Sequence, residues 1–178
     1  MDKIYCFPGN AGTSFIAENI NINLNNFQEI KEKIKNLKID IVVVGPEKPL
    51  VDGIVDFLEK NEIKVFGPNK VSSQLEGSKI FTKKLCEKYK IPTANFGVFE
   101  NKKKSLNFLK KCKFPIVVKA DGLASGKGVY ICDTLEQSKI AVDEIFNGKF
   151  GKTKEILIEE FLKGEEMSFF IISDGINY

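Results

Sequence analysis

The sequence predicts an α/β protein built from two units, and three observations support that prediction. In the first part of the chain, short apolar runs alternate with helical patterns, an order that is typical of a parallel sheet. Three of these runs end in turns of glycine and proline. Beyond Ile91-Pro92, a second unit follows in which two short strands flank a glycine-rich turn. We place the boundary between residues 70 and 100, and divide the chain into domains at residues 1–70 and 71–178.

The first domain shows clear periodicity. Strand-like apolar runs cover residues 4–7, 39–44 and 64–66. Apolar residues recur at helical spacing over residues 26–37 and 50–61, and Asn25 or Asn26 is the expected cap of the first helix. In open α/β sheets, ligands bind beyond the carboxyl ends of the strands. Glycine and proline often simply end a strand, but three such turns together favour a binding surface.

The second domain begins with a long helical pattern from residue 72 to about 89. After it we expect helices at residues 105–111 and 135–146 and strands at residues 116–119, 129–132, 156–160 and 167–172. The chain has neither a low-complexity segment nor a convincing internal repeat.

Composition excludes several classes of function. The 178 residues are 43% hydrophobic and 29% charged, as in an ordinary soluble globular protein. No apolar run reaches the roughly 18–20 residues of a membrane helix, and the start does not resemble a signal peptide. We therefore expect a cytoplasmic protein with no membrane partner. The net charge is only +3 and the lysines alternate with glutamates, which indicates solvated faces and no nucleic-acid partner.

The chain contains no histidine and no arginine, and these absences exclude several kinds of catalytic and binding site. Without histidine, the chain has no Ser-His catalysis and no His–metal site. Without arginine, an anion must be held by lysine, backbone N–H groups or a metal. The four cysteines are widely spaced and could form disulfides, but such spacing more often means reduced core residues.

The most informative stretch is a glycine-rich turn after a buried strand. The strand ends in Lys119, and the turn at residues 122–128 carries three glycines and Lys127. Glycine lets backbone amides approach a phosphate closely, and lysine neutralises its charge. The spacing is not that of a Walker A loop, because a strand follows and no Ser or Thr comes after the lysine. Taken alone, such a turn is also compatible with a purely structural role.

A second stretch lies downstream, at residues 156–168. There an apolar strand runs into paired acids, an apolar pair and Gly-Glu-Glu. Backbone groups at such a place can read an adenine edge, apolar side chains can cover its face, and a carboxylate can accept ribose hydroxyls. Taken alone, a hairpin with an acidic tip is the simpler interpretation.

Together these motifs resemble the ATP-grasp superfamily. The evidence is VVKADGLASGKGV followed by IEEFLKGEEMS, with QLEGSK upstream. The segments PGNAGT and GPEKPL narrow the resemblance to the phosphoribosylamine–glycine ligase (glycinamide ribonucleotide synthetase) family, with all motifs in the same order over nearly the whole chain. The resemblance implies a partial Rossmann-like parallel-sheet N-domain followed by the ATP-grasp nucleotide-binding subdomain, an α+β unit with an antiparallel sheet.

The resemblance also implies residue roles. Lys79 and Lys119 would contact ATP phosphates, the turn would close over the triphosphate, and Glu166 would hold the ribose. The backbone of Glu160 and of Leu162 would meet adenine. The full set implied for ATP is Lys79, Lys119, Gly122, Ser125, Gly126, Lys127, Gly128, Glu159, Glu160, Phe161, Leu162 and Glu166. The set implied for phosphoribosylamine is Pro8, Gly9, Asn10, Ala11, Gly12 and Thr13 around its phosphate, with Glu47 at its ribose. The phosphate set lies on a turn that we expect to be rich in free N–H groups.

The implied reaction joins glycine to 5-phosphoribosylamine through a glycyl phosphate, giving glycinamide ribonucleotide, ADP and phosphate. ATP and Mg²⁺ or Mn²⁺ are the implied cofactors, with the metal ligands and much of the glycine site beyond residue 178. The family's first strand–helix unit would precede Asp2. We therefore expect weak or no ligase activity from these 178 residues alone, and self-association through exposed sheet edges, although the complete enzyme would be a monomer.

Two alternatives remain open. Another ATP-grasp enzyme, such as a purine or biotin-dependent carboxylase subunit, would keep the ATP residues but not PGNAGT with GPEKPL. A non-catalytic ATP-binding fragment would keep all of these motifs and perform no chemistry.

Overall fold

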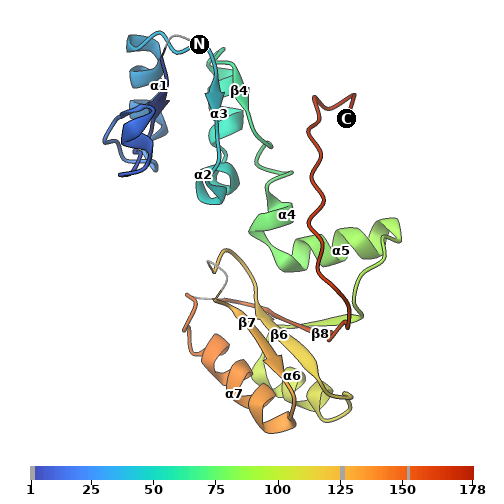
Figure 1. Ribbon diagram of the computed structural model, residues 1–178. Helices are drawn as coiled ribbons and strands as arrows, with labels where there is room; N and C mark the ends of the chain where they lie inside the picture. Colours follow the sequence, from blue (N-terminus) through green and yellow to red (C-terminus); the bar gives the residue numbers. More distant parts are fainter. Residues whose placement is uncertain (1–2, 125–126, 152) are drawn as a thin grey trace. The chain divides into compact units, whose positions relative to one another are not determined.

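A computed structural model describes residues 3–124, 127–151 and 153–178. The chain forms two compact units (Figure 1). Of the described residues, the first unit holds 3–91 and 121–124, and the second holds 92–120, 127–151 and 153–178. Within these ranges, no helix has the length and apolar character needed to span a membrane.

The first unit contains two pairs of parallel strands. Strand β1 (Tyr5–Cys6) pairs with β2 (Glu18–Asn19), which follows the short 3₁₀ helix η1 (Thr13–Phe15). Strand β3 (Val42–Val43) pairs with β4 (Val65–Phe66). The parallel pairing confirms the prediction, although each strand is shorter than its apolar run. The prediction missed β2, because a Glu-Asn pair carries no apolar strand signal.

The first predicted helix is confirmed. Helix α1 (Phe27–Asn36) is capped by Asn26, whose side chain accepts a hydrogen bond of 3.2 Å from the Glu29 amide. The helix buries Ile30 and Ile34 in a core shared with the following helices. Helical spacing at residues 26–37 therefore predicted both the helix and its buried face.

Two longer helices were predicted as single elements, and both are broken. The pattern at residues 50–61 forms α2 (Glu47–Asp52) and α3 (Ile54–Lys60), separated by Gly53 at a left-handed φ of 99°. The pattern from residue 72 forms α4 (Gln74–Gly77) and α5 (Lys79–Tyr89). Between them Ser78 is extended, and its hydroxyl caps α5 by accepting from the Phe81 amide at 3.0 Å. Both breaks follow local backbone chemistry that apolar spacing does not register.

The second unit is built on a four-stranded antiparallel sheet in the order β5-β8-β6-β7 (Figure 1). Its strands are β5 (Phe96–Phe99), β6 (Ile116–Ala120), β7 (Val129–Cys132) and β8 (Ile156–Glu160). Three of them were predicted and β5 was not. The antiparallel sheet confirms the α+β character expected of this unit.

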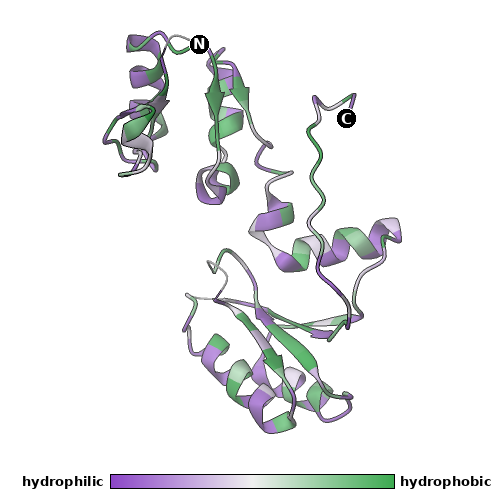
Figure 2. Cartoon of the chain, in the orientation of Figure 1, coloured by the Kyte–Doolittle hydropathy of each residue, from purple (hydrophilic) through white to green (hydrophobic). Residues whose placement is uncertain are grey.

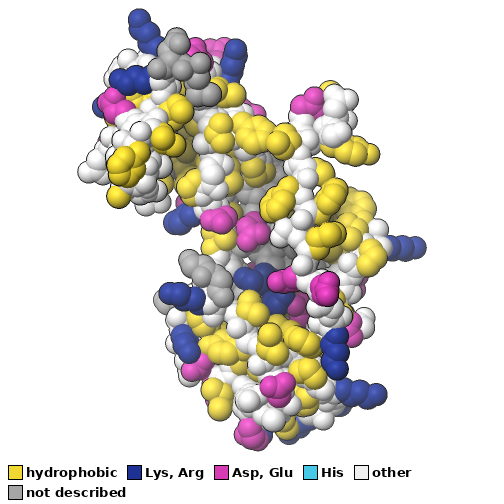
Figure 3. Space-filling view, in the orientation of Figure 1, with side chains coloured by type: hydrophobic (Ala, Val, Ile, Leu, Met, Phe, Trp, Pro, Cys, Tyr) yellow, Lys and Arg dark blue, Asp and Glu magenta, His cyan; other side chains and the backbone are white. Residues whose placement is uncertain are grey.

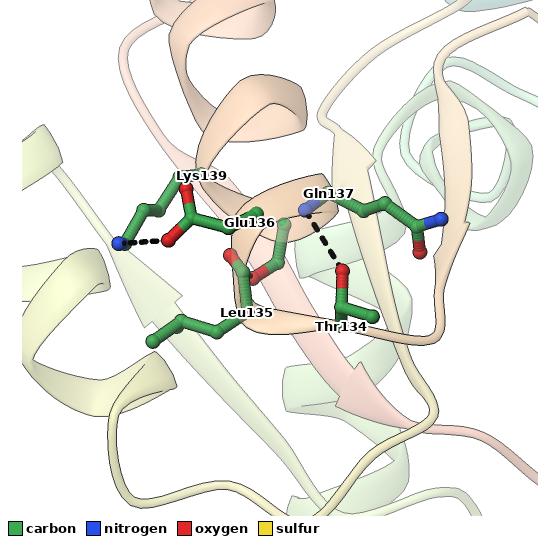
Figure 4. Close-up of polar contacts among 6 residues, drawn as sticks. Thr134, Leu135, Glu136, Gln137 and Lys139 are labelled. Atoms are coloured by element: carbon green, nitrogen blue, oxygen red, sulfur yellow. Dashed lines mark hydrogen bonds and ion pairs between the residues drawn. The ribbon is translucent and has the colours of Figure 1, made fainter.

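Helices α6 (Lys102–Leu109) and α7 (Leu135–Phe146) cover one face of this sheet. Both were predicted, with α6 beginning three residues earlier than expected. The apolar colouring of β6, β7 and β8 in Figure 2 follows the core beneath the helices, which includes Val118, Ile158 and Val142, all fully buried. In Figure 4, Thr134 caps α7 by accepting from the Gln137 amide at 3.2 Å.

The strand predicted at residues 167–172 is wrong. Residues 161–178 form no helix or strand in the structure, and the large apolar side chains beyond Phe161 are exposed, as Figure 3 shows along the C-terminal segment. Phe170, for example, is 86% exposed. A strand requires a hydrogen-bonded neighbour, and no described residue supplies one to this segment.

Candidate functional site

The first half of the glycine-rich turn is fastened to the start of α5, within the first unit. Lys79 donates a hydrogen bond of 2.9 Å from its Nζ to the carbonyl oxygen of Gly122. Beside it, the Asp121 carboxylate accepts from the Ser78 hydroxyl at 3.0 Å and from the Ile80 amide at 3.1 Å. The structure thus brings one predicted phosphate lysine to one predicted turn glycine.

Lys127 and Gly128, at the end of the turn, belong to the hairpin between β6 and β7 in the second unit. The Ala120 amide donates to the carbonyl oxygen of Gly128 at 2.8 Å and closes the hairpin, while Lys127 is exposed. Gly122 has a φ of +90°, and a side chain there would meet no atom within 4 Å. Glycine is therefore favoured at this position by the backbone conformation, and not because a side chain would clash with a neighbour. The predicted residues Ser125 and Gly126 lie outside the described residues.

Lys119 lies on the sheet face opposite α6 and α7. Alternation along β6 places Val118 and Ala120 in the core beneath the helices, so Lys119 points to the other face. There its ammonium forms an ion pair with Glu159 of β8. The Lys119 side chain is 25% exposed and that of Glu159 only 7%, so the pair is largely removed from water. Glu159 thus holds the lysine in place.

The segment after Glu159 is also anchored to β5. The Glu160 carboxylate accepts from the Asn95 amide at 3.0 Å and from its side-chain nitrogen at 3.1 Å. The Glu160 amide in turn donates to the Asn95 carbonyl at 3.0 Å. A ligand that reads the Glu160 N–H would have to displace this bond. Beyond it, Phe161 is half-buried, and Leu162 and Glu166 are exposed.

The turn at residues 8–13 follows β1 and is closed by its own side chains. Asn10 accepts from the amides of Gly12 and Thr13 at 2.8 and 3.0 Å, and Thr13 accepts from the Asn10 amide at 2.8 Å. The expectation of a turn rich in free N–H groups is therefore wrong for these three amides, because short polar side chains satisfy them locally. Asn19 completes the network by donating to the Asn10 carbonyl at 2.7 Å.

Gly9 shows how tightly the turn is built. Its φ is +79°, and a Cβ at this position would lie 2.1 Å from the side-chain oxygen of Asn19. Pro8, Asn10, Ala11 and Gly12 are exposed, so the outer surface of the turn is open to solvent.

Glu47 is the first residue of α2 and lines a pocket of about 280 Å³ in the first unit. The pocket lies between α2 and the start of α4, and its lining is Glu47, Leu50, Val51, Pro68, Ser72, Ser73, Leu75 and Glu76. Its walls are almost entirely apolar. Gly45-Pro46 ends the strand before Glu47, as the sequence predicted.

Several residues at these sites were not predicted. Asn19 and Asn95 hold the predicted site residues Asn10 and Glu160 by hydrogen bonds. Asp121 instead holds Ser78 and Ile80, the two neighbours of the predicted Lys79. The sequence signal of Asn19, Asn95 and Asp121 is weak, since each is a single polar residue beside a strand. For Asp121, the one available signal was its position between the strand that carries Lys119 and the first glycine of the turn.

The donor sets fit an anion better than a metal. Lysine nitrogens and glycine amides suit phosphate groups. Among residues 3–124, 127–151 and 153–178, no group of three or more Cys, Asp or Glu side chains is placed to hold a metal ion. The described residues therefore do not fit a metal site. All four cysteines are free thiols, as expected, but only Cys132 is fully buried, and burial raises its pKa.

Two family models together match the whole chain. "Phosphoribosylglycinamide synthetase, N domain" matches residues 1–76, and "Phosphoribosylglycinamide synthetase, ATP-grasp (A) domain" matches residues 77–178.

Two curated relatives carry the same name. The chain is 47% identical to the phosphoribosylamine–glycine ligase of Clostridium acetobutylicum, over 98% of this chain and 42% of that protein. It is also 47% identical to the ligase of that name from Brucella melitensis, over 98% of this chain and 41% of that protein. The chain thus spans about two fifths of the length of the curated relatives that it matches.

Solved structures agree with this. The phosphoribosylamine–glycine ligase of Thermotoga maritima matches 92% of this chain and 39% of its own, with a TM-score of 0.72 and 33% identity. The biotin carboxylase domain of the Hydrogenobacter thermophilus 2-oxoglutarate carboxylase has a TM-score of 0.68, but its 19% identity indicates a shared fold alone.

Proposed function

The chain belongs to the phosphoribosylglycinamide synthetase family, with an ATP-grasp fold in its second part, and on that premise we propose that it supplies the ATP- and phosphoribosylamine-binding parts of a phosphoribosylamine–glycine ligase. The reaction joins glycine to 5-phosphoribosylamine and yields glycinamide ribonucleotide, ADP and phosphate. The family rules out the alternative of a carboxylase subunit. The alternative of an ATP-binding fragment without chemistry is addressed by experiment below.

The observation that supports ATP binding best is the fixed position of Lys119. A lysine that is only 25% exposed, held on a sheet face by a buried glutamate and followed by a glycine-rich turn, is placed to bind an anion. Lys79, whose Nζ donates to the Gly122 carbonyl oxygen, is the second lysine that we assign to the phosphates. Together the lysines and the turn would neutralise the triphosphate, so that catalysis rests on positioning and charge.

The remaining roles extend this proposal. Phe161, Leu162 and Glu166 would contact the adenosine, with Glu166 accepting from the ribose hydroxyls. In the first unit, the open surface of the turn at residues 8–13 would meet the phosphate of phosphoribosylamine, and Glu47 its ribose. The proposed domains are residues 1–70 for this substrate and 71–178 for ATP. Mg²⁺ or Mn²⁺ would neutralise the triphosphate further, held by residues beyond this chain.

Equilibrium dialysis with labelled ATP tests the nucleotide site. We expect Lys119→Ala and Glu166→Ala each to weaken ATP binding by about tenfold or more, the effect of losing one charge-assisted hydrogen bond. Lys103→Ala is the matched control, because Lys103 is exposed on α6. Equal affinities across the three variants would refute the assignment.

Activity is a separate measurement. We expect the purified 178-residue chain to bind ATP but to release ADP slowly or not at all when glycine and phosphoribosylamine are added. Rapid ADP release that depends on both substrates would contradict this expectation and would exclude the alternative of a fragment without chemistry.

A further inference from the structure

Asp121 directly follows β6 and lies outside the predicted set of nucleotide-binding residues, yet its carboxylate is fully engaged. Both of its oxygens lie within hydrogen-bond distance of the Ser78 hydroxyl, at 3.1 and 3.0 Å. One of them also accepts from the Ile80 amide at 3.1 Å. The Ser78 oxygen itself accepts from the Phe81 amide at 3.0 Å. Asp121 therefore completes the cap of α5 from 41 residues away.

Two further features connect this cap to the turn. Lys79, between Ser78 and Ile80, donates to the carbonyl oxygen of Gly122, the residue after Asp121. Residues 78–80 and residues 121–122 are thus joined twice, by the Asp121 carboxylate from one segment and by the Lys79 ammonium from the other. All of these groups are partly or fully buried. The fastening therefore occurs where hydrogen bonds to charged groups are stronger than at an open surface.

We infer that Asp121 is a positioning residue for the phosphate site, which holds Lys79 and the first half of the glycine-rich turn in one fixed arrangement before the nucleotide binds. The inference rests on the proposed function, because it concerns the triphosphate of ATP. A free lysine side chain loses considerable conformational entropy when it is ordered on binding. A lysine that is already ordered binds the ligand without that cost.

The carboxylate has a second consequence. The first amides of a helix lack partners within the helix and attract anions. Here Asp121 occupies the Ile80 amide, and Ser78 occupies that of Phe81. These two amides are therefore already bound, and the side chain of Lys79 is the contact that we assign to a phosphate at this end of α5.

The test compares ATP with adenosine, which lacks the phosphates, by equilibrium dialysis on the purified chain. We expect Asp121→Ala to weaken ATP binding by about tenfold, the cost of one lost charge-assisted hydrogen bond, and to leave adenosine binding within about twofold. Asp121→Asn keeps an oxygen that accepts from Ile80 and is expected to restore most of the ATP affinity. Asp40→Ala, at an exposed loop aspartate, is the control.

A second comparison tests whether Asp121 affects ATP binding through Lys79. In a Lys79→Ala background, Asp121→Ala is expected to have little further effect, because the lysine that it positions is gone. If Asp121→Ala does not fold, Ser78→Ala replaces it, with an expected loss of about threefold in ATP affinity alone.

The outcomes separate the inference from the function. If the wild-type chain does not bind ATP, the proposed function fails and this inference with it. If the wild type binds ATP and Asp121→Ala binds equally well, the inference alone fails. If Asp121→Ala loses ATP and adenosine binding equally, the residue is only structural and the inference is overturned.

Discussion

The ion pair between Lys119 and Glu159 is largely buried, so removing one partner should lower the stability of the second unit by an amount that depends on how buried the other partner is. Lys119→Met removes the cation that pairs with a carboxylate of 7% exposure. Breaking a buried pair from one side costs about 3–5 kcal/mol, because the other charge stays in a medium of low dielectric constant. We therefore expect Lys119→Met to destabilise the second unit by about 3 kcal/mol.

Removing the other partner of the pair is predicted to lower the free energy of unfolding by less. Glu159→Gln leaves an ammonium that is 25% exposed, so water and a flexible stem reduce the cost to about 1 kcal/mol. The double variant is expected to be less destabilised than the sum of the two single variants, by about 1 kcal/mol or more. Such coupling is the signature of a direct interaction.

Hydrogen exchange followed by mass spectrometry measures this within the second unit. Peptides that cover β6 and β8 report the opening free energy of the strands that carry the pair. Lys104→Met is the control, since Lys104 and its partner Glu100 are 66% and 70% exposed and lie 3.8 Å apart. That variant should change the opening free energy by under about 1 kcal/mol. Equal effects of Lys104→Met and Lys119→Met, or strict additivity in the double variant, would refute the reasoning.

The other predictions concern single residues. Gly9→Ala places a Cβ 2.1 Å from the Asn19 oxygen at a φ of +79°, so it should destabilise the first unit by about 1–3 kcal/mol in urea unfolding; an unchanged midpoint would contradict this. Ile158→Ala empties a fully buried site in the central strand β8 and should cost about 3 kcal/mol by the same assay, more than any surface alanine. The hydrogen bond from Lys149 lowers the pKa of Glu144, so this carboxylate stabilises the fold above its ordinary pKa of 4.5 and loses that effect as the pH falls through its lowered value. Glu144→Gln should therefore flatten the acid limb of a plot of stability against pH, and an unaltered limb would disprove the linkage.

The fold was predictable wherever a single local signal was strong. Periodicity located α1, whose expected cap was Asn25 or Asn26 and is Asn26, and apolar runs located β6 and β8. Periodicity failed where one residue interrupts it, as at Gly53 and Ser78, because apolar spacing is blind to backbone conformation. The two-residue strand β2 gave no signal of its own, since it is defined only by its pairing with β1.

The segment at residues 167–172 shows the opposite failure, in which a strand was predicted and none forms. Its run of large apolar residues, Met167 to Ile172, has the composition of a strand. Composition describes what a strand prefers, but pairing decides whether one forms, and this segment is unpaired within the described ranges.

By itself, the sequence determined the motifs: which lysines, glycines and acids occur, in what order, and in which family that order is found. Their types are fixed by the chemistry of phosphate, which requires positive charge and close backbone approach. Only the tertiary structure decided how those residues are held. Asp121 caps a helix 41 residues upstream, Glu159 pairs with Lys119 of the neighbouring strand, and Asn10 satisfies amides that were expected to be free. Such partners depend on distances across the fold, and spacing along the chain does not encode them.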